Sequence, residues 1–464
     1  MSGKCRVLFL YPNVGGARRI ALGISILSSC LKKAGHEVDV FDGTFYKAKD
    51  LANELRVEIG VFQEADMSEV YTRVDKGDIR DGFLKKVRSY KPDIIALTLI
   101  QDDYFLSRRL LQGIKKVSNA FVVAGAHLPT AAPKLVLQGL DIDAVAVGEG
   151  EVAMVSLADA IAKGGDPYKT PNLCYLKDGE LVRNAVAPLV SLEELEAHDY
   201  SIFDDEHLWR PFCGKKHRVG YVQLTRGCPF NCTFCSNGIF KDIYGDKGRV
   251  RSRSLDQFIR EAAGLKERYG LHLMSFFDEN FLGYPRLEEL CEKWKASVDL
   301  PFMMQTRVET IEPKKLQILK RMGCITISVG IESGDEGFRR KMLNRRYSNE
   351  TVVRAFRWLR EAGIRTTANN IIGFPHENEE QIKRTVALNR ECRPDSVKVA
   401  YFAPYIGSAL HALCLKEGLI KDELIDCGAL VFVCSLDFPA GHKQMLRHYF
   451  EHFQELVFSD PVAG

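Results

Sequence analysis

Three cysteines lie within eight residues of one another in the segment TRGCPFNCTFCSNG, residues 225–238. Cys228, Cys232 and Cys235 have the spacing C-x3-C-x2-C, and no fourth cysteine or histidine follows at a suitable distance. Structural zinc sites close with four ligands, which usually come in two short pairs. Thiolates also suit iron–sulfur clusters, and three of them on one loop can hold three irons of a cubane while the fourth iron stays open. The spacing therefore favours an iron–sulfur site over structural zinc or a chance group of thiols.

Polar residues and a glycine recur at the ends of the strands that follow this loop. The segment YVQLTRGC (221–228) reads as a strand that runs into the cysteines, and strands then alternate with helices, which predicts a partial barrel of parallel strands. Glu279 follows the strand LMSFF, and Arg307 ends the strand FMMQTR. Glu332 and Ser333 end ITISVGIES, and Gly373 follows TANNII. Each residue alone has an ordinary interpretation as a solvated strand end or a turn.

Strands and helices also alternate over the first third of the chain. Apolar runs at 5–12, 37–42, 93–99, 120–125 and 143–151 are typical of strands buried on both faces, and helices are predicted before Gly35, at 105–117 and at 132–140. This order predicts a doubly wound parallel sheet with a ligand crevice at the carboxyl ends of its strands. The segment GGARR (15–19) is not G-x-G-x-x-G, which argues against a dinucleotide. Glycines gather instead in AGAHLPT (124–130) and VGEGE (147–151).

Length and composition exclude several classes of protein. A chain of 464 residues is too long for one ordinary core, so two or three domains are expected. The net charge of +3 comes with no basic stripe, which disfavours a nucleic-acid partner. No apolar stretch approaches the ~20 residues that cross a bilayer, and the N-terminus reads as a buried strand rather than a signal peptide. The protein is therefore expected in the cytoplasm with reduced thiols, and Cys30, Cys291 and Cys324 read as core residues.

The cysteine loop resembles the defining motif of the radical S-adenosylmethionine (radical SAM) superfamily, C-x3-C-x-aromatic-C, with Phe234 as the aromatic residue. In the first third, the segments YP, LGISILSSCLKKAGHEVDVFD, PDIIALTL, VVAGAHLPT and VGEGE, in this order, resemble the cobalamin-binding domain that precedes many radical SAM enzymes. The sequence lacks D-x-H-x-x-G, so the resemblance implies cobalamin bound without a histidine on cobalt.

This resemblance implies an α/β chain with a Rossmann-like doubly wound sheet, a partial (β/α)6 TIM-type barrel and a small, mainly helical C-terminal region. The implied domains are a cobalamin-binding domain at 1–150, a connector at 151–215, the radical SAM barrel at 216–410 and the helical region at 411–464.

Three cofactors and their contacts are also implied. The three cysteines hold a 4Fe–4S cluster, whose open iron binds the amino nitrogen and a carboxylate oxygen of S-adenosylmethionine. The residues implied to contact S-adenosylmethionine are Phe234, Ser236, Asn237, Glu279, Arg307, Glu332, Ser333 and Gly373. The residues implied to contact cobalamin are Gly125, His127, Thr130, Gly148, Glu149 and Gly150.

The implied chemistry is reductive cleavage of S-adenosylmethionine to a 5′-deoxyadenosyl radical, followed by methyl transfer from methylcobalamin to an unactivated carbon of a metabolite. The expected partners are a small-molecule substrate and a one-electron reductant such as flavodoxin or ferredoxin. Two alternatives stay open. One is a cobalamin-dependent radical cyclase or ring-rearrangement enzyme without methyl transfer, and the other is a non-catalytic cobalamin and iron–sulfur redox or sensory protein.

Overall fold

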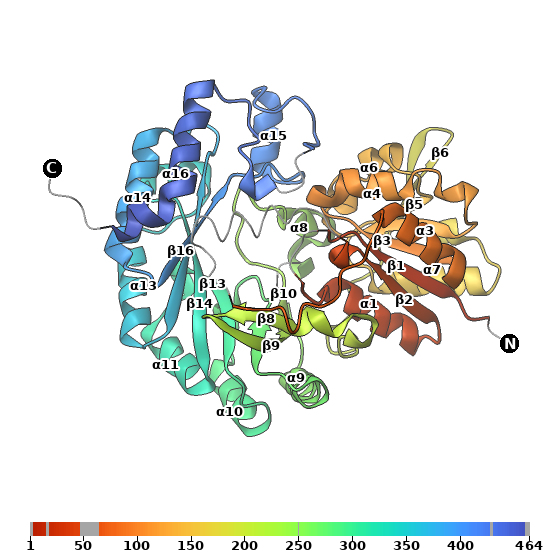
Figure 1. Ribbon diagram of the computed structural model, residues 1–464, viewed down its shortest axis with the longest axis horizontal. Helices are drawn as coiled ribbons and strands as arrows, with labels where there is room; N and C mark the ends of the chain where they lie inside the picture. The colour runs from red at the N-terminus through yellow and green to blue at the C-terminus, as the bar shows by residue number, and fades with distance from the viewer. Residues whose placement is uncertain (1–2, 15–17, 47–64, 249, 427–429, 460–464) are drawn as a thin grey trace. The chain divides into compact units, whose positions relative to one another are not determined.

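The chain folds into two units in the computed structural model, which describes residues 3–14, 18–46, 65–248, 250–426 and 430–459 (Figure 1). The first unit comprises Met1–Leu51, Met67–Trp209 and Ser236–Gly248, and the second comprises Ala52–Asp66, Arg210–Cys235 and Arg249–Gly464. The chain therefore passes from the second unit to the first directly after Cys235. Residues 15–17 of the segment GGARR lie outside the described residues.

A seven-stranded sheet forms the first unit, in the order β2-β1-β3-β4-β5-β6-β7. β1 to β5 pair in parallel, and β6 and β7 add an antiparallel hairpin at one edge. The order reverses between β1 and β3, which is the kind of position where doubly wound sheets bind ligands. The strands are β1 (Arg6–Tyr11), β2 (Glu37–Asp42), β3 (Ile94–Thr98), β4 (Phe121–Gly125), β5 (Ala144–Ala146), β6 (Leu173–Lys177) and β7 (Glu180–Arg183).

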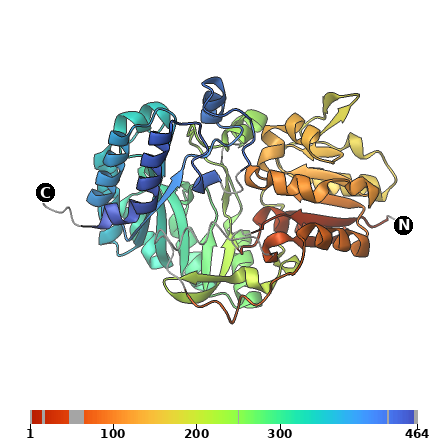
Figure 2. The same ribbon diagram turned by 45° about the horizontal axis from the view of Figure 1, so that its top comes forward.

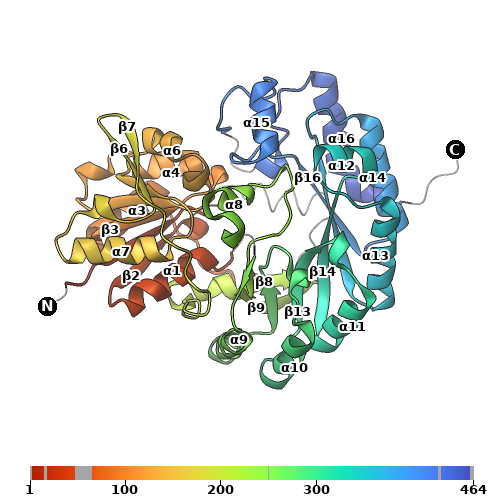
Figure 3. The ribbon, with the colours of Figure 1, turned by 180° about the vertical axis from the view of Figure 1, so that it is seen from behind.

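Helices cover both faces of this first sheet, as Figure 3 shows. α1 packs beside α7, and α3 packs beside α4. Asp78 caps the N-terminus of α3, because its side chain accepts hydrogen bonds from the first free backbone N–H groups of this helix. The helices are α1 (Leu22–Lys33), α3 (Ile79–Tyr90), α4 (Tyr104–Leu111), α5 (His127–Ala131), α6 (Pro133–Gly139), α7 (Glu151–Ala162) and α8 (Gly238–Tyr244).

The first unit differs from the sequence prediction in two places. The helix predicted at 105–117 ends at Leu111, because Gly113 adopts a left-handed conformation (φ 70°) that an α-helix does not continue through. Residues 151–183, assigned above to a connector, supply α7 and the β6–β7 hairpin of the first sheet. Leu173 and Cys174 of β6 are buried, so the hairpin packs as part of this core.

Parallel strands curl into a half-barrel in the second unit, with the sheet order β16-β15-β14-β13-β12-β9-β8 (Figure 2). All neighbours from β9 to β16 in this order pair in parallel, as the partial barrel requires. The predicted fold class is thereby confirmed. The strands are β8 (Trp209–Phe212), β9 (Lys215–Val222), β10 (Thr225–Arg226), β11 (Arg251–Ser252), β12 (Leu273–Phe276), β13 (Phe302–Arg307), β14 (Cys324–Glu332), β15 (Arg365–Ile372) and β16 (Ser396–Tyr401).

Helices line the outer side of this curled sheet and leave its carboxyl strand ends to carry loops (Figure 1). Phe276 of β12 packs against the rings of Trp294 and Phe302, with centroids 5.2 Å and 4.9 Å away, which fixes α10 against the sheet. No helix within the described ranges is long and apolar enough to cross a membrane. The helices are α9 (Leu255–Tyr269), α10 (Leu287–Ser297), α11 (Pro313–Met322), α12 (Glu336–Met342), α13 (Asn349–Glu361), α14 (Glu379–Cys392), α15 (Ala409–Lys416) and α16 (Ala440–Phe458).

Candidate cluster and cofactor site

Asp278 anchors the strand end from which the cysteine loop begins. It lies two residues beyond β12 and is fully buried. Its Oδ1 accepts hydrogen bonds from the N–H (2.6 Å) and the hydroxyl (2.5 Å) of Thr225, and its Oδ2 accepts one from the N–H of Leu224 (3.3 Å). Burial raises the pKa of Asp278 to about 7, and these hydrogen bonds oppose the shift. Gly227 then adopts φ 92° and turns the chain into Cys228.

The middle of the cysteine loop is held by the segment 342–344 and by α15. The Thr233 hydroxyl donates to the Met342 carbonyl (2.5 Å), and the Thr233 N–H donates to the Leu343 carbonyl (3.4 Å). The side-chain amide of Asn344 donates to the Asn231 carbonyl (2.8 Å), and the N–H of Leu410 donates to the Thr233 carbonyl (3.0 Å). Elements far along the chain therefore fix the course of this short loop.

The three cysteine side chains of the loop are partly buried. They supply the number and kind of ligands that three irons of a cubane need. Among the residues that the structure describes, no group of three or more His, Cys, Asp or Glu side chains is arranged to hold a metal ion. Metal binding orders its own ligands, so the final geometry of such a site depends on the metal as well as on the loop. The donor set itself fits a three-cysteine cluster.

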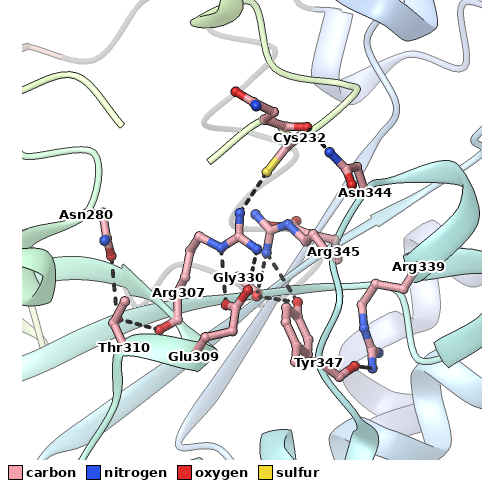
Figure 4. A network of polar contacts seen from close by, with 12 residues as sticks. Cys232, Asn280, Arg307, Glu309, Thr310, Gly330, Arg339, Asn344, Arg345 and Tyr347 are labelled. Carbon is pink, nitrogen blue, oxygen red and sulfur yellow. Dashed lines mark hydrogen bonds and ion pairs between the residues drawn. The ribbon is translucent and has the colours of Figure 1, made fainter. Parts of the chain in front are cut away.

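Arg307 brings a positive charge to this loop (Figure 4). It ends β13, is buried, and its Nη1 donates to the Sγ of Cys232 (3.1 Å). Its guanidinium lies 3.7 Å from the ring centroid of Phe230, and its remaining donors form an ion pair with Glu309. Arg307, predicted to contact S-adenosylmethionine, is thus placed at the cysteine loop.

Glu332 and Arg345 form a buried ion pair in the same region. Glu332 ends β14 just after a β-bulge, with φ 65°, and its Oε1 lies 3.1 Å from Nη2 of Arg345. Arg345 Nη1 also donates to the Gly330 carbonyl (2.9 Å), and its guanidinium lies 5.4 Å from the ring centroid of Phe234. Burial raises the pKa of Glu332, while Arg345 and, more weakly, Arg307 oppose this shift. Arg345 was not predicted, because an arginine in the charged run RRKMLNRR reads as a surface residue.

Phe234 packs beside the turn that follows β15. Its ring centroid lies 6.0 Å from that of Phe374, which is fully buried. Gly373 adopts φ 79°, and its N–H and that of Phe374 donate to Oε2 of Glu377, at 2.6 Å and 3.3 Å. Burial raises the pKa of Glu377 to about 8, opposed by these two hydrogen bonds. The predicted residues Phe234 and Gly373 are therefore brought together, and Glu377, which was not predicted, holds the turn.

Ser333 and Glu279 differ in what they offer a ligand. Ser333 is fully buried, and its hydroxyl accepts a hydrogen bond from the Asp335 N–H (3.4 Å), so it supports the end of β14. Glu279 is partly buried, and its Oε2 is enclosed without a hydrogen-bond partner. Burial raises the pKa of Glu279, while backbone N–H groups of Glu279 itself and Gly227 oppose the shift. An enclosed acceptor of this kind fits the ammonium group of an amino acid.

The first unit carries its own candidate site at the carboxyl ends of β4 and β5. The Thr130 hydroxyl accepts from the Gly148 N–H (3.1 Å) and donates to the Ala126 carbonyl (2.7 Å), which ties the two loops together. A Cβ on Gly125 would meet no heavy atom closer than the Ala146 carbonyl oxygen at 4.0 Å, so this backbone is open to a ligand. A Cβ on Gly150 would lie 3.3 Å from a Leu27 methyl group, which indicates a packing role.

Helix α8, directly after the cysteine loop, packs on these same loops. The Tyr244 hydroxyl accepts from the Glu149 N–H (2.8 Å), and a Cβ on Gly148 would lie 2.1 Å from this hydroxyl. Nε2 of His127 lies 3.2 Å from Oδ1 of Asn237. His127 was predicted for cobalamin and Asn237 for S-adenosylmethionine, and the structure brings the two side chains together. Ser236, also predicted, is partly buried, and its carbonyl accepts from the Ile239 N–H at 3.1 Å.

Replacing Arg345 by methionine should destabilise the second unit, because Glu332 would remain buried without its partner. The expected loss of unfolding free energy is about 3–5 kcal/mol. Differential scanning calorimetry of the apoprotein measures it as a lower transition temperature. The matched control is Arg346→Met, an exposed neighbour, with an expected change within about 0.5 kcal/mol. The double variant Glu332→Gln/Arg345→Met should regain part of the loss, and equal effects of Arg345→Met and Arg346→Met would contradict the assignment.

Glu377 should make stability fall as pH rises. Its folded pKa of about 8 lies above its ordinary 4.5, so the folded state binds the proton more tightly. The contribution of protonated Glu377 is complete below about pH 4.5 and is lost as pH rises through about 8. Glu377→Gln keeps an acceptor for Gly373 and removes this titration, so its transition temperature relative to wild type should increase between pH 5 and pH 8.5, taken as roughly spanning both values. Glu380→Gln, at an exposed position on α14, is the control, and a pH-independent difference for Glu377→Gln would refute the account.

Two family models match the chain, one in each of the regions described above. The Radical SAM superfamily model matches residues 222–388, and the B12 binding domain model matches residues 16–158. The first match contains the cysteine loop and the strand ends of the half-barrel from β12 to β15, and the second contains β2 to β5.

Curated relatives align along most of the chain. An uncharacterized methyltransferase of Pyrococcus horikoshii is 25% identical over 89% of this chain and 84% of its own length. An anaerobic magnesium-protoporphyrin IX monomethyl ester cyclase of Rubrivivax gelatinosus is 26% identical over 86% of this chain and 68% of its own length.

A solved structure shares the fold over nearly the whole chain. The radical S-adenosylmethionine methyltransferase TsrM from Kitasatospora setae, with cobalamin and a 4Fe–4S cluster bound, has a TM-score of 0.67 and 17% identity, covering 96% of this chain and 85% of that chain. Together with the two family models, the cysteine loop and the parallel strand ends establish the assignment. The chain belongs to the radical SAM superfamily and carries a B12 binding domain ahead of its radical SAM domain, so it is a cobalamin-dependent radical SAM enzyme related to methyltransferases, with a 4Fe–4S cluster, S-adenosylmethionine and cobalamin as its cofactors.

Proposed function

We propose that this enzyme transfers a methyl group to an unactivated carbon of a small-molecule substrate. The observation that carries the proposal is the set of three cysteines on one loop, with Arg307 beside Cys232, in a chain that also has a B12 binding domain. When bound, the cluster with S-adenosylmethionine supplies a 5′-deoxyadenosyl radical, and cobalamin supplies a methyl group. The relative from Pyrococcus horikoshii, which is named as a methyltransferase, supports this choice of reaction.

Within this proposal, the strand ends of the second unit bind S-adenosylmethionine. Cys228, Cys232 and Cys235 hold the cluster. The enclosed Oε2 of Glu279 accepts the amino group, and Arg307 holds the carboxylate once the Cys232 sulfur is engaged in the cluster. The remaining residues of the second unit frame the nucleoside, with Glu332 as a ribose acceptor fixed by Arg345, Ser333 as its support, and Phe234 and Gly373 along the loop and the turn. Ser236 and Asn237, which follow the loop in sequence, remain predicted contacts.

In the first unit, we assign cobalamin to the carboxyl ends of β4 and β5. Gly125 leaves its backbone open there, and Gly148 allows α8 to approach. The residues that frame the site are His127, Thr130, Glu149 and Gly150. The cobalamin-binding domain proposed for residues 1–150 is then completed by α7 and the β6–β7 hairpin of residues 151–183, and the radical domain remains assigned to residues 216–410, followed by the helical region at 411–464.

A radical cyclase or ring-rearrangement enzyme is the second candidate, because the relative from Rubrivivax gelatinosus is a cyclase and aligns over 86% of this chain. Both candidates need an electron, so we propose a one-electron reductant such as flavodoxin or ferredoxin as the partner. A nucleic-acid substrate is not proposed, because the net charge of the chain is only +3.

Each of the three loop cysteines should be required for the cluster. Changing Cys228, Cys232 or Cys235 to alanine removes one of only three thiolate ligands, so reconstituted protein should lose most of its bound iron and sulfide and the visible absorbance of the cluster. Anaerobic reconstitution with iron and sulfide analyses measures the loss. Cys213→Ala removes an exposed thiol outside the loop and should leave the cluster content unchanged. Full iron and sulfide content in any of the three loop variants would refute the ligand assignment.

Product analysis distinguishes the candidate functions. Holoenzyme loaded with cluster and cobalamin is incubated with a small-molecule metabolite extract as the source of acceptor, a chemical reductant, and S-adenosylmethionine labelled with deuterium in its methyl group. Methyl transfer predicts 5′-deoxyadenosine together with S-adenosylhomocysteine, and Cys232→Ala should form no 5′-deoxyadenosine. Formation of 5′-deoxyadenosine without S-adenosylhomocysteine would favour the cyclase, and formation of neither would refute a radical enzyme and leave the redox or sensory protein.

A further inference from the structure

Exposed positive charges gather on the segment that holds the cysteine loop. The run RRKMLNRR, residues 339–346, includes the last turn of α12 and the residues after it. Arg340, Lys341 and Arg346 are exposed, and within the described part of the chain none of them makes a hydrogen bond or an ion pair with another residue. We call these three residues the basic patch.

The other two arginines of this run point inward and are accounted for. Arg345 pairs with Glu332, and Arg339 donates to the Ser333 carbonyl (2.6 Å) and the Tyr347 carbonyl (2.8 Å). Figure 4 shows both side chains turned into the network beneath Cys232. The buried and exposed cations of the run therefore have different uses. Arg339 and Arg345 hold the chain around the end of β14. The three exposed charges make no such contact with the described residues.

The basic patch lies next to the cysteine loop in the structure. Between Lys341 and Arg346 stand Met342, Leu343 and Asn344, the three residues whose backbone carbonyls or side-chain amide hold Thr233 and Asn231. Figure 4 shows Asn344 reaching the loop at Cys232. The loop is exposed at its tip, because Pro229 and Asn231 are both solvent-exposed. A protein docked on the basic patch would thus stand beside the exposed edge of the loop.

The positive charge of the basic patch determines which kind of partner protein fits it. Unpaired cations on one patch attract an acidic surface, which steers association and fixes orientation more than it adds affinity. Electron transfer falls off steeply with distance, so an electron donor must dock close to the acceptor. The basic patch meets both conditions, since it is cationic and flanks Met342, Leu343 and Asn344, which are hydrogen-bonded to the loop that carries the cluster ligands.

We propose that Arg340, Lys341 and Arg346 form the docking surface for an acidic one-electron donor protein of the flavodoxin type. This proposal rests on the function proposed above, because it identifies where that reaction receives its electron. The fully reduced flavin of the donor gives up one electron and becomes the semiquinone, and the cluster takes up that electron. The patch itself neither binds S-adenosylmethionine nor ligates iron, so its loss should spare the chemistry.

The experiment compares two reductants on the same holoenzyme. The variant Arg340→Glu/Lys341→Glu/Arg346→Glu reverses the charge of the basic patch. The control Arg260→Glu/Lys314→Glu/Arg365→Glu makes the same change of charge at exposed residues of α9, α11 and β15. With limiting reduced flavodoxin at low ionic strength, the patch variant should form 5′-deoxyadenosine at least tenfold more slowly than wild type, and the control should stay within twofold. With dithionite, which needs no docking, all three proteins should react at similar rates. Added salt should slow the flavodoxin reaction of wild type and have little effect on the patch variant.

A direct titration of holoenzyme with flavodoxin separates docking from catalysis. The patch variant should bind at least tenfold more weakly than wild type, whether or not cleavage takes place. If wild type forms no 5′-deoxyadenosine with dithionite, the proposed function fails, and the titration still decides the docking surface. Unchanged flavodoxin binding in the patch variant would overturn the proposal. So would an equal loss of rate with both reductants, or patch-dependent binding of a single-stranded RNA oligonucleotide in place of flavodoxin.

Discussion

The buried ion pair between Glu332 and Arg345 is the interaction on which the geometry of the cysteine loop depends. A carboxylate enclosed at the end of β14 is stable only if a cation compensates it, because removing both charges from water is costly. Arg345 meets this need from the segment after α12 and thereby fixes that segment against β14. The same segment then presents two carbonyls and an amide to the loop. The left-handed conformation of Glu332 (φ 65°) is a strained arrangement that this pairing helps to hold.

Buried arginines and buried carboxyl groups occupy different positions around the cysteine loop. Arg307 lies beside the Cys232 sulfur, and Arg345 lies beside the ring of Phe234, so two buried guanidiniums stand close to the cysteine loop. The buried carboxyls of Asp278 and Glu377 are held by backbone N–H groups instead, and burial raises the pKa of each. Cations thus stand close to the loop, while the carboxyl groups of Asp278 and Glu377 fix the start of the loop and the turn after β15.

Much of this arrangement follows from the sequence, and the remainder depends on tertiary contacts. The cysteine spacing and the strand-end positions of Glu279, Arg307, Glu332 and Gly373 could be predicted, because parallel strands bring their carboxyl ends to one edge. The inward direction of Arg345 could not, since five cations in an eight-residue run give no periodicity that separates buried from exposed arginines. Helix α8 is a similar case. Its sequence neighbours are the cysteines, yet Tyr244 packs on Gly148, about a hundred residues earlier in the chain, and no local pattern encodes that contact.

The position of α8 has a consequence for how such an enzyme can be divided. The segment Ser236–Gly248 belongs to the first unit, although it lies in sequence between two segments of the second unit. Neither unit is therefore a continuous stretch of sequence. Residues 1–209 expressed alone would lack the tyrosine that caps the Glu149 N–H and the asparagine beside His127. A gene fusion or a domain exchange with a cut ahead of β9 would therefore transfer an incomplete cobalamin domain. Because a segment of the first unit lies within the sequence of the second, the coding sequences of the two units have to be transferred together.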